Sequence, residues 1–171
     1  YEQAVTPRLS VEESFEDGAY TLTFTQHTPP TPGQAEKQPL VLPIAVGLLS
    51  PNGDEVVPTR VLEMTEARQS FTFEGLASKP VPSILRGFSA PVVLERAADR
   101  DERAFLMAHD TDPFNKWEAG RALARESLIA TVRTGAAPDA AWLEGVAAIL
   151  RDESFEPAFR AQMLALPTQS E

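Results

Sequence analysis

Two histidines are the side chains of this chain best suited to bind a metal or move a proton. His27 is followed by Thr28 and Pro29, and His109 is followed by Asp110. In a His-Glu-x-x-His helix two imidazoles lie one turn apart on one face and can hold zinc, with the glutamate as general base. Neither histidine begins that motif. We interpret His27, which borders a proline-rich stretch, as a surface or interface residue.

The carboxylates after the second histidine suggest a cation site, but their spacing does not fit one. A calcium loop beginning at Asp110 needs an oxygen ligand where Phe114 stands, glycine where Asn115 stands and glutamate where Arg121 stands. All three requirements fail. Asp112 is instead followed by proline, a pairing typical of a helix start, so we expect it to cap a helix.

Other arrangements that could do chemistry have simpler interpretations. Carboxylates adjacent in sequence point to different sides, which disfavours a glycosidase pair and favours solvated turn residues. No serine stands in a Gly-x-Ser-x-Gly elbow, so a hydrolase nucleophile is not supported. We therefore predict no catalytic, metal-binding or cofactor-binding residue in this chain. The acidic pairs and serines considered are Glu12-Glu13, Glu16-Asp17, Asp152-Glu153, Ser89 and Ser127.

Charge excludes nucleic acid as an expected partner. The net charge is −10 over 171 residues. Residues 1–97 carry seven basic and twelve acidic side chains, and residues 98–171 carry eight and thirteen. Neither half is a basic face of the kind that binds phosphate backbones.

Composition indicates a folded protein without disulfides or a membrane span. Apolar residues make up 43% of the chain, enough for a real core, and cysteine is absent. The absence of cysteine is compatible with a reducing cytoplasm, and we expect a cytoplasmic location. The longest apolar run, near Leu40 to Leu49, contains Pro43 and is shorter than the roughly 20 residues that a membrane span needs.

Residues 1–97 have the pattern of an all-β domain. Apolar and polar residues alternate from Tyr20 to Thr25, while Leu40–Leu49 is apolar enough for a strand buried in a sandwich core. Turn residues separate several short strands, which predicts an Ig-like β-sandwich. The expected strands are Arg8–Val11, Ala19–Gln26, Leu40–Leu49, Arg60–Met64, Gln69–Phe73 and Pro91–Glu95, with further candidates at Val56-Val57 and Ser83–Phe88.

Residues 98–171 change to helical spacing, and we place the domain boundary at Ala97. A short helix is expected from Asp101 to His109, and a long one from Asp112 to about Gly135. Two more begin near Pro138 and Pro157. Antiparallel helices with short loops predict the start of a helical superhelix. The apolar positions expected on the long helix are Phe114, Trp117, Leu123 or Ala124, Leu128 and Val132.

Several long segments resemble one enzyme family. These are TPPTPGQAEKQPL at Thr28–Leu40, YEQAVTP at the start, the stretch Val61–Glu95, and FLMAHDTDPFNKWEAGRAL at Phe105–Leu123. Together they resemble the bacterial aminopeptidase N group of the M1 zinc aminopeptidases. The resemblance covers the Ig-like third domain and the first helices of the C-terminal helical domain.

The resemblance implies a structural role within a larger enzyme. The zinc motif and the Gly-Ala-Met-Glu-Asn substrate motif of that family are absent from this chain, so the catalytic domain is expected elsewhere in the parent protein. The parent would remove N-terminal amino acids from peptides with a zinc-bound water. This segment would be a spacer that joins the catalytic domain to the helical domain enclosing the active-site chamber.

Two aromatic residues are our candidates for packing between the domains. Trp117 lies one turn beyond the Asp112 cap on the same helix face as Phe114, so both are placed near the junction. Burial of Trp117 among the helices alone is an equally good interpretation. The rival function is a stand-alone Ig-like module that binds a protein or ligand, and exposed aromatic residues on one sandwich face would favour it.

Overall fold

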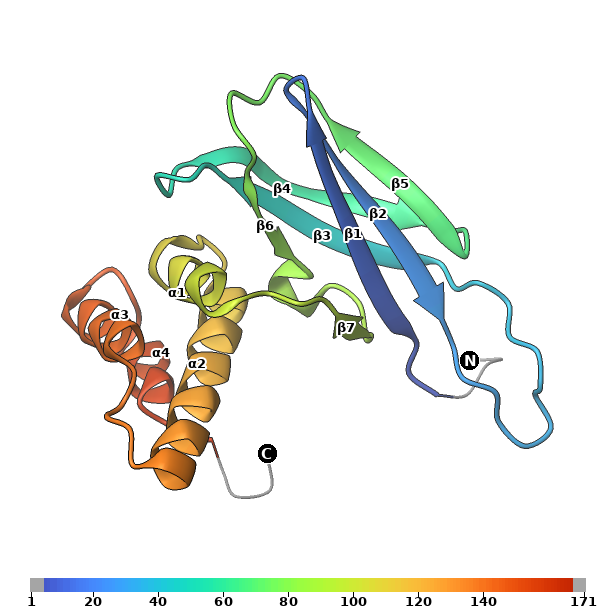
Figure 1. Cartoon of the computed structure of the whole chain (residues 1–171). Coiled ribbons are helices and arrows are strands. Elements are labelled where there is room, and N and C mark those ends of the chain that lie inside the picture. Colours follow the sequence, from blue (N-terminus) through green and yellow to red (C-terminus); the bar gives the residue numbers. More distant parts are fainter. Residues whose placement is uncertain (1–4, 168–171) are drawn as a thin grey trace. The chain divides into compact units, whose positions relative to one another are not determined.

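The structure, a computed structural model, describes residues 5–167. The chain divides into two compact units, Tyr1–Ala97 and Ala98–Glu171. Within the described residues, the expected fold class is confirmed, since a β-sandwich is followed by four α-helices (Figure 1). None of these helices is both long enough and apolar enough to cross a bilayer.

Two sheets form the sandwich. The larger has the strand order β5-β2-β1-β7 and the smaller has the order β4-β3-β6. β1 pairs antiparallel with β2 and parallel with β7, and β3 lies between its two antiparallel neighbours. The strands are β1 (Arg8–Glu16), β2 (Ala19–His27), β3 (Leu42–Leu49), β4 (Glu55–Met64), β5 (Arg68–Phe73), β6 (Val81–Ile84) and β7 (Val93–Glu95).

Alternation along β2 decides which side chains enter the core. Every second residue is buried, as the period of a strand requires. The threonines between them face the other way, and Thr21 hydrogen bonds with Thr72 of β5 at 2.8 Å. The turn that joins β1 to β2 has positive φ at Asp17 and Gly18, which matches a tight hairpin turn. The buried residues of β2 are Tyr20, Leu22, Phe24 and Gln26.

β1 is longer than the sequence predicted. An end at Val11 was expected because Glu12 and Glu13 resemble turn residues, yet both lie within the strand. Their carboxylates are paired with different arginines: Glu12 lies 2.8 Å from Arg68, and Glu13 lies 2.6 Å from Arg96. Paired side chains thus let two acidic residues continue a strand, and the turn interpretation of this pair was wrong.

β3 is buried on both faces, which is unusual for an antiparallel sandwich strand. Every second residue from Leu42 to Leu48 belongs to the sandwich core. Of the residues between them, Pro43 is exposed, whereas Ala45 and Gly47 face away from that core but are buried as well, and so is Leu49. The apolar composition of the stretch therefore reflects two buried faces.

Arg86 covers the outer face of β3 at Gly47. A Cβ atom added at Gly47 would lie 2.1 Å from Arg86 Cζ, so only glycine leaves room for the guanidinium. Arg86 is 4% exposed and donates hydrogen bonds to Glu55, Thr59 and Ser83. The charge is therefore paired and hydrogen-bonded where it is buried, as a buried charge must be.

The strand that precedes Arg86 ends earlier than expected. We expected Ser83–Phe88 to be a possible strand, but β6 ends at Ile84 and a 3-10 helix (Arg86–Phe88) follows. Leu85 and Phe88 both adopt positive φ, at 60° and 55°. Bulky residues seldom adopt that conformation, so this turn has no recognisable sequence pattern.

β4 joins two segments that the sequence separated. Val56-Val57 and Arg60–Met64 were expected as separate strands, and Pro58 lies between them. One strand contains both because β4 is an edge strand whose register with β3 shifts between Val46 and Leu48. A proline is tolerated on an edge strand at such a bulge, since no ladder hydrogen bond is needed there.

The loop between β2 and β3 is stabilised by its own side chains. Gln26 brackets Leu40, donating to its carbonyl and accepting from its amide, both at 2.8 Å. Gly33 adopts positive φ, and the backbones of Thr31 and Gln34 form a bridge there. Leu40 is thus held by a side chain rather than by a neighbouring strand, and β3 begins at Leu42, two residues later than predicted.

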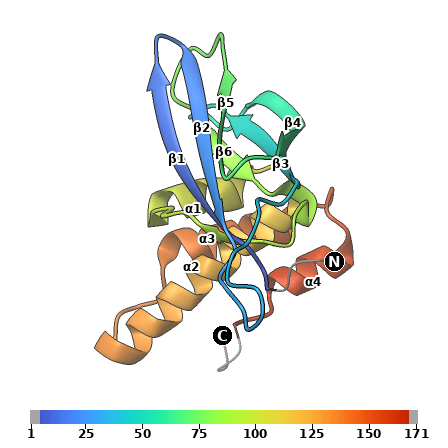
Figure 2. The same cartoon turned by 90° about the vertical axis from the view of Figure 1, so that its right-hand side faces the viewer.

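The helical unit contains α1 (Arg100–His109), α2 (Pro113–Thr134), α3 (Ala140–Arg151) and α4 (Pro157–Met163). The first three begin alike. Asp99, Asp112 and Asp139 each accept a hydrogen bond from the backbone amide three residues later. The expected cap at Asp112 is therefore confirmed. α2, the long helix in Figure 2, contacts each of the other three helices.

Met107 fills the centre of the helical unit. It is completely buried and lies against Gly120 of α2 and Gly145 of α3. A Cβ at Gly145 would lie 2.8 Å from its sulfur, so these glycines make room for the methionine. The apolar face of α2 that packs in the core ends before Val132. This residue is 85% exposed, so the prediction that it belongs to the apolar face was wrong. The last helical residues after it are also exposed, so no other residue of the described part of the chain covers that end of the helix.

Gly47→Ala is expected to destabilise the sandwich by about 2–4 kcal/mol. The new methyl displaces Arg86 and breaks its pairing with the partly exposed Glu55, while the guanidinium stays uncompensated. Urea unfolding followed through NMR signals of β3 amides measures the change. Tryptophan fluorescence serves as the internal control because it reports on the helical unit: both tryptophans lie after residue 97.

A second background isolates the cause. In an Arg86→Ala chain the clash is gone, so Gly47→Ala should add about 0.5 kcal/mol or less. An equal cost in both backgrounds would show that Arg86 is not what requires glycine at this position.

Candidate functional site

The two histidines lie in different units of the chain. His27 is the exposed last residue of β2, and His109 is the exposed last residue of α1. The ring of His109 lies 4.8 Å from that of Phe105 on its own helix. Across residues 5–167, no group of three or more histidine, cysteine, aspartate or glutamate side chains is arranged to hold a metal ion.

The serines considered as nucleophiles serve the backbone instead. Ser89 Oγ accepts a hydrogen bond from the amide of Ala45, on the outer face of β3, at 2.9 Å. Ser127 Oγ accepts from the amide of Asp139 at 2.8 Å. Each hydroxyl accepts a hydrogen bond from a backbone amide that the helices and strands leave unpaired. This structural role explains both serines without a catalytic function.

Asp139 joins the start of α3 to α1. Its carboxylate lies 2.6 Å from Nε of Arg100 and accepts from the amide of Trp142. The hydrogen bond from Arg100 is the main reason that the pKa of Asp139 lies below its usual value. This carboxylate is a helix cap held by an ion pair, at the surface of the helical unit.

Lys116 is a buried charged residue of the helical unit, and sequence reasoning missed it. It lies on α2 with 5% of its surface exposed, and Nζ donates to the carbonyls of Met107 at 2.9 Å and Ala108 at 2.8 Å. These are among the last carbonyls of α1, which have no partner within their own helix. A lysine that crosses from one helix to cap the end of another leaves no periodic signal in the sequence.

Burial sets the protonation behaviour of Lys116. Loss of water around the ammonium lowers the pKa of Lys116 from its usual value, and the charges of Asp110 and Asp152 oppose that shift. The ammonium also lies 5.6 Å from the ring centre of Phe155, a cation–π contact. Lys116 therefore joins α1 to the segment between α3 and α4 and has no access to a substrate.

Phe114 and Trp117 lie side by side on the first turns of α2. Their ring centres are 5.9 Å apart, and both side chains are half-buried. Trp117 packs against the core of the helical unit, whereas Phe114 is not part of that cluster. The guanidinium of Arg121 lies 5.2 Å from the Trp117 ring centre.

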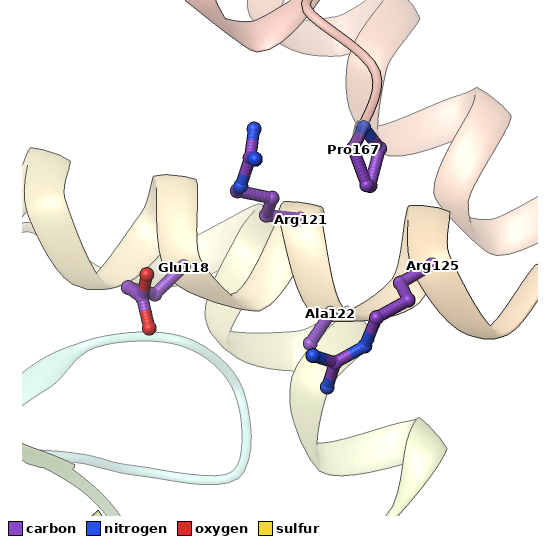
Figure 3. A pocket seen from close by; sticks show the side chains of 5 residues that line it. All are labelled: Glu118, Arg121, Ala122, Arg125 and Pro167. Atoms are coloured by element: carbon purple, nitrogen blue, oxygen red, sulfur yellow. The ribbon is translucent and has the colours of Figure 1, made fainter. Parts of the chain in front are cut away.

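A concavity in the helical unit lies along α2. We call it the α2 concavity; it has a volume of about 280 Å³ and is lined by Glu118, Arg121, Ala122, Arg125 and Pro167. In Figure 3, the Arg121 and Pro167 side chains lie above Ala122, the Arg125 guanidinium lies close to Ala122, and Glu118 lies farther to the left. The hollow exists because alanine is short between longer side chains.

Comparison with known families identifies both halves of the chain. Residues 6–97 match the family described as "Domain of unknown function (DUF3458) Ig-like fold". Residues 100–171 match its companion, described as "Domain of unknown function (DUF3458_C) ARM repeats". The chain belongs to the DUF3458 family. Its Ig-like and helical parts therefore both have the fold class that the sequence predicted.

Curated relatives of this DUF3458 chain are aminopeptidases. It is 36% identical over 186 residues to aminopeptidase N of Escherichia coli K12, covering 100% of this chain and 21% of that protein. It is 42% identical over 175 residues to aminopeptidase N of Caulobacter vibrioides, covering 99% of this chain and 20% of that protein. The chain spans about a fifth of the length of these relatives. The resemblance to the aminopeptidase N group is confirmed.

A solved structure supports the same assignment. Aminopeptidase A of Legionella pneumophila, in complex with aspartic acid, superposes with a TM-score of 0.78 at 26% sequence identity. The superposition covers 95% of this DUF3458 chain and 19% of that enzyme.

The stability of the helical unit is expected to rise with pH below about 10.4, the usual pKa of lysine. The folded state holds Lys116 at a lowered pKa, so the unfolded state binds more protons in that window and raising the pH favours folding. Lys116 is the only lysine after residue 97, where cysteine and tyrosine are absent, so nothing else should titrate there.

Lys116→Met is the matched variant for this prediction. This variant should lose the rise of stability with pH. It should also lower the free energy of unfolding by about 1–3 kcal/mol at neutral pH, because the last carbonyls of α1 lose their hydrogen-bond donor. Urea unfolding followed by tryptophan fluorescence between pH 7 and about 10.5 measures both effects. A wild-type profile that is flat, or one that is identical in Lys116→Met, would contradict the assignment.

Proposed function

We propose that this chain is a non-catalytic part of an M1 zinc aminopeptidase, a spacer between the catalytic domain and the rest of the helical domain. One observation carries the proposal: at 36–42% identity, essentially all of this chain aligns with about a fifth of aminopeptidase N. On this view the remaining four fifths of the parent supply the catalytic domain and the further helices, which are the partners of this segment.

The use of ionisable residues supports a structural role. Arg86 covers the outer face of β3, Lys116 caps α1, and Asp139 begins α3. An active site needs such groups directed at a ligand, whereas these are directed at the backbone or at each other. In the proposed parent, zinc and the peptide substrate bind outside this segment, and the enzyme works in the cytoplasm.

We further propose that residues 1–97 and 98–171 are the two domains of the segment and that Phe114 and Trp117 pack near their junction. The support is the incomplete burial of both rings and their position on the first turns of α2. Trp117 also contacts the helical core, so Phe114 is the better probe of the junction.

The rival, a stand-alone Ig-like binding module, has less support. Such modules use large exposed aromatic residues as anchors. Among the described residues of the sandwich, Phe88 at 59% exposure is the only large aromatic side chain of that kind. The other exposed apolar residues are scattered valines, which need no explanation.

The purified chain is expected neither to bind stoichiometric zinc nor to cleave an aminoacyl anilide. The full-length product of the same gene is expected to do both. Zinc content by mass spectrometry and anilide hydrolysis, measured on both proteins after repurification, provide the comparison. Hydrolysis by the 171-residue chain that increases with its zinc content would refute the proposal, and so would a full-length product without activity.

Phe114→Ala is expected to separate the unfolding of the two units. If Phe114 packs at the junction, its loss weakens the coupling, so melting curves from tryptophan fluorescence and from sandwich amide signals diverge by about 2–4 °C per kcal/mol. Ile129→Ala, an exposed apolar residue of the same helix, is the control. Two curves that stay together within about 1 °C would exclude a junction role.

A further inference from the structure

The turn that joins β3 to β4 contains an asparagine followed by a glycine, Asn52-Gly53. The amide of Gly53 donates to the carbonyl of Ser50 at 2.9 Å, and the amide of Ser50 donates to the carbonyl of Asp54 at 2.8 Å. Gly53 has a φ of 96°, so the loop between Ser50 and Asp54 closes on a left-handed glycine, as three-residue hairpin loops commonly do. Asn52 is exposed in this loop.

An asparagine that precedes a glycine can lose its side-chain amide without an enzyme. The glycine backbone nitrogen gives up its proton and attacks the asparagine Cγ, a C–N bond forms, and the side-chain nitrogen takes up a proton and leaves as ammonia. Water then opens the cyclic imide at either of its two carbonyls, which leaves aspartate or isoaspartate. Glycine favours the attack because it has no Cβ to obstruct the approach of its nitrogen.

The only other asparagine of the chain, Asn115, has neither of these features. It is followed by lysine and lies in the first turn of α2. The nitrogen that would attack it belongs to Lys116, and its amide donates to the carbonyl of Asp112 within the helix. Asn115 therefore serves as an internal reference for Asn52.

The side chain of Asn52 is held at both of its polar atoms. Its Oδ1 accepts a hydrogen bond from Oγ of Ser50, and its Nδ2 donates to the carboxylate of Asp54 at 2.8 Å. The attacking nitrogen is held as well, because the proton that it must lose makes the hydrogen bond from Gly53 to Ser50. We call these three hydrogen bonds the Asn52 clamp. Ring closure requires the clamp to open.

We propose that Asn52 is a site of spontaneous conversion to aspartate and isoaspartate, and that the Asn52 clamp sets the rate of this reaction. The rate follows the population of the locally opened turn, so each hydrogen bond that is removed should raise it about twofold to tenfold. Either product carries a carboxylate, which cannot donate to Asp54, so the reaction also removes part of the clamp. The proposal concerns the sandwich unit and does not depend on the aminopeptidase assignment.

The test is incubation of the full 171-residue chain at mildly alkaline pH, followed by peptide mapping with mass spectrometry to locate the loss of ammonia. Conversion is expected at Asn52 and not at Asn115. Ser50→Ala removes the donor to Oδ1 and Asp54→Ala the acceptor of Nδ2, so each should raise the rate about twofold to tenfold. Ser70→Ala, which removes an exposed side-chain hydrogen bond from β5 in the other sheet, should leave it unchanged.

Incubation in guanidinium separates the chemistry from the clamp. Asn52 should convert about tenfold or more faster in the denatured wild type than in the native one, and Ser50→Ala should then match the wild type. NMR signals of β3 amides, recorded on each variant before incubation, test that the sandwich is still folded. Equal native and denatured rates in the wild type would overturn the proposal. A native rate that neither Ser50→Ala nor Asp54→Ala changes, or conversion of Asn115 as fast as that of Asn52, would overturn it as well.

Discussion

The burial of β3 on both faces is the constraint on which the sandwich depends. The inner face is closed by the opposite sheet, as in any β-sandwich, but the outer face needs its own cover. Arg86 supplies it at Gly47, and Ser89 accepts the amide hydrogen bond of Ala45. The positive φ of Leu85 and Phe88 turns the chain so that these side chains can reach the strand. A rare backbone conformation is thus retained because a buried charge and a buried strand both require it.

The helical unit uses a comparable solution on a smaller scale. Lys116 crosses from α2 to the free carbonyls of α1, while Met107 occupies the space that Gly120 and Gly145 leave open. In both units a long side chain reaches a neighbouring element and a glycine makes the room. This use of charged residues in the fold itself, rather than at a ligand, is why we assign the chain a structural role.

The sequence predicted elements whose evidence is local. β2 follows from alternation and α2 from its Asp-Pro start, because periodicity and capping involve neighbouring residues. It misplaced features that depend on distant partners: β1 continues past Glu13 because Arg96 pairs with it, eighty-three residues away. The buried roles of Arg86 and Lys116 were missed for the same reason, since no local pattern shows which carbonyl or carboxylate a long side chain will meet. The α2 concavity likewise depends on Pro167, which lies far along the chain from Glu118.

The central claim is that this chain organises an aminopeptidase whose chemistry lies elsewhere in the polypeptide. A structure of the full-length gene product, with zinc located by anomalous scattering, tests it most directly. The account predicts one zinc ion held by a His-Glu-x-x-His helix and a further glutamate, all from outside these 171 residues. A zinc ion ligated by any residue of this chain, or a full-length product without such a helix, would contradict it.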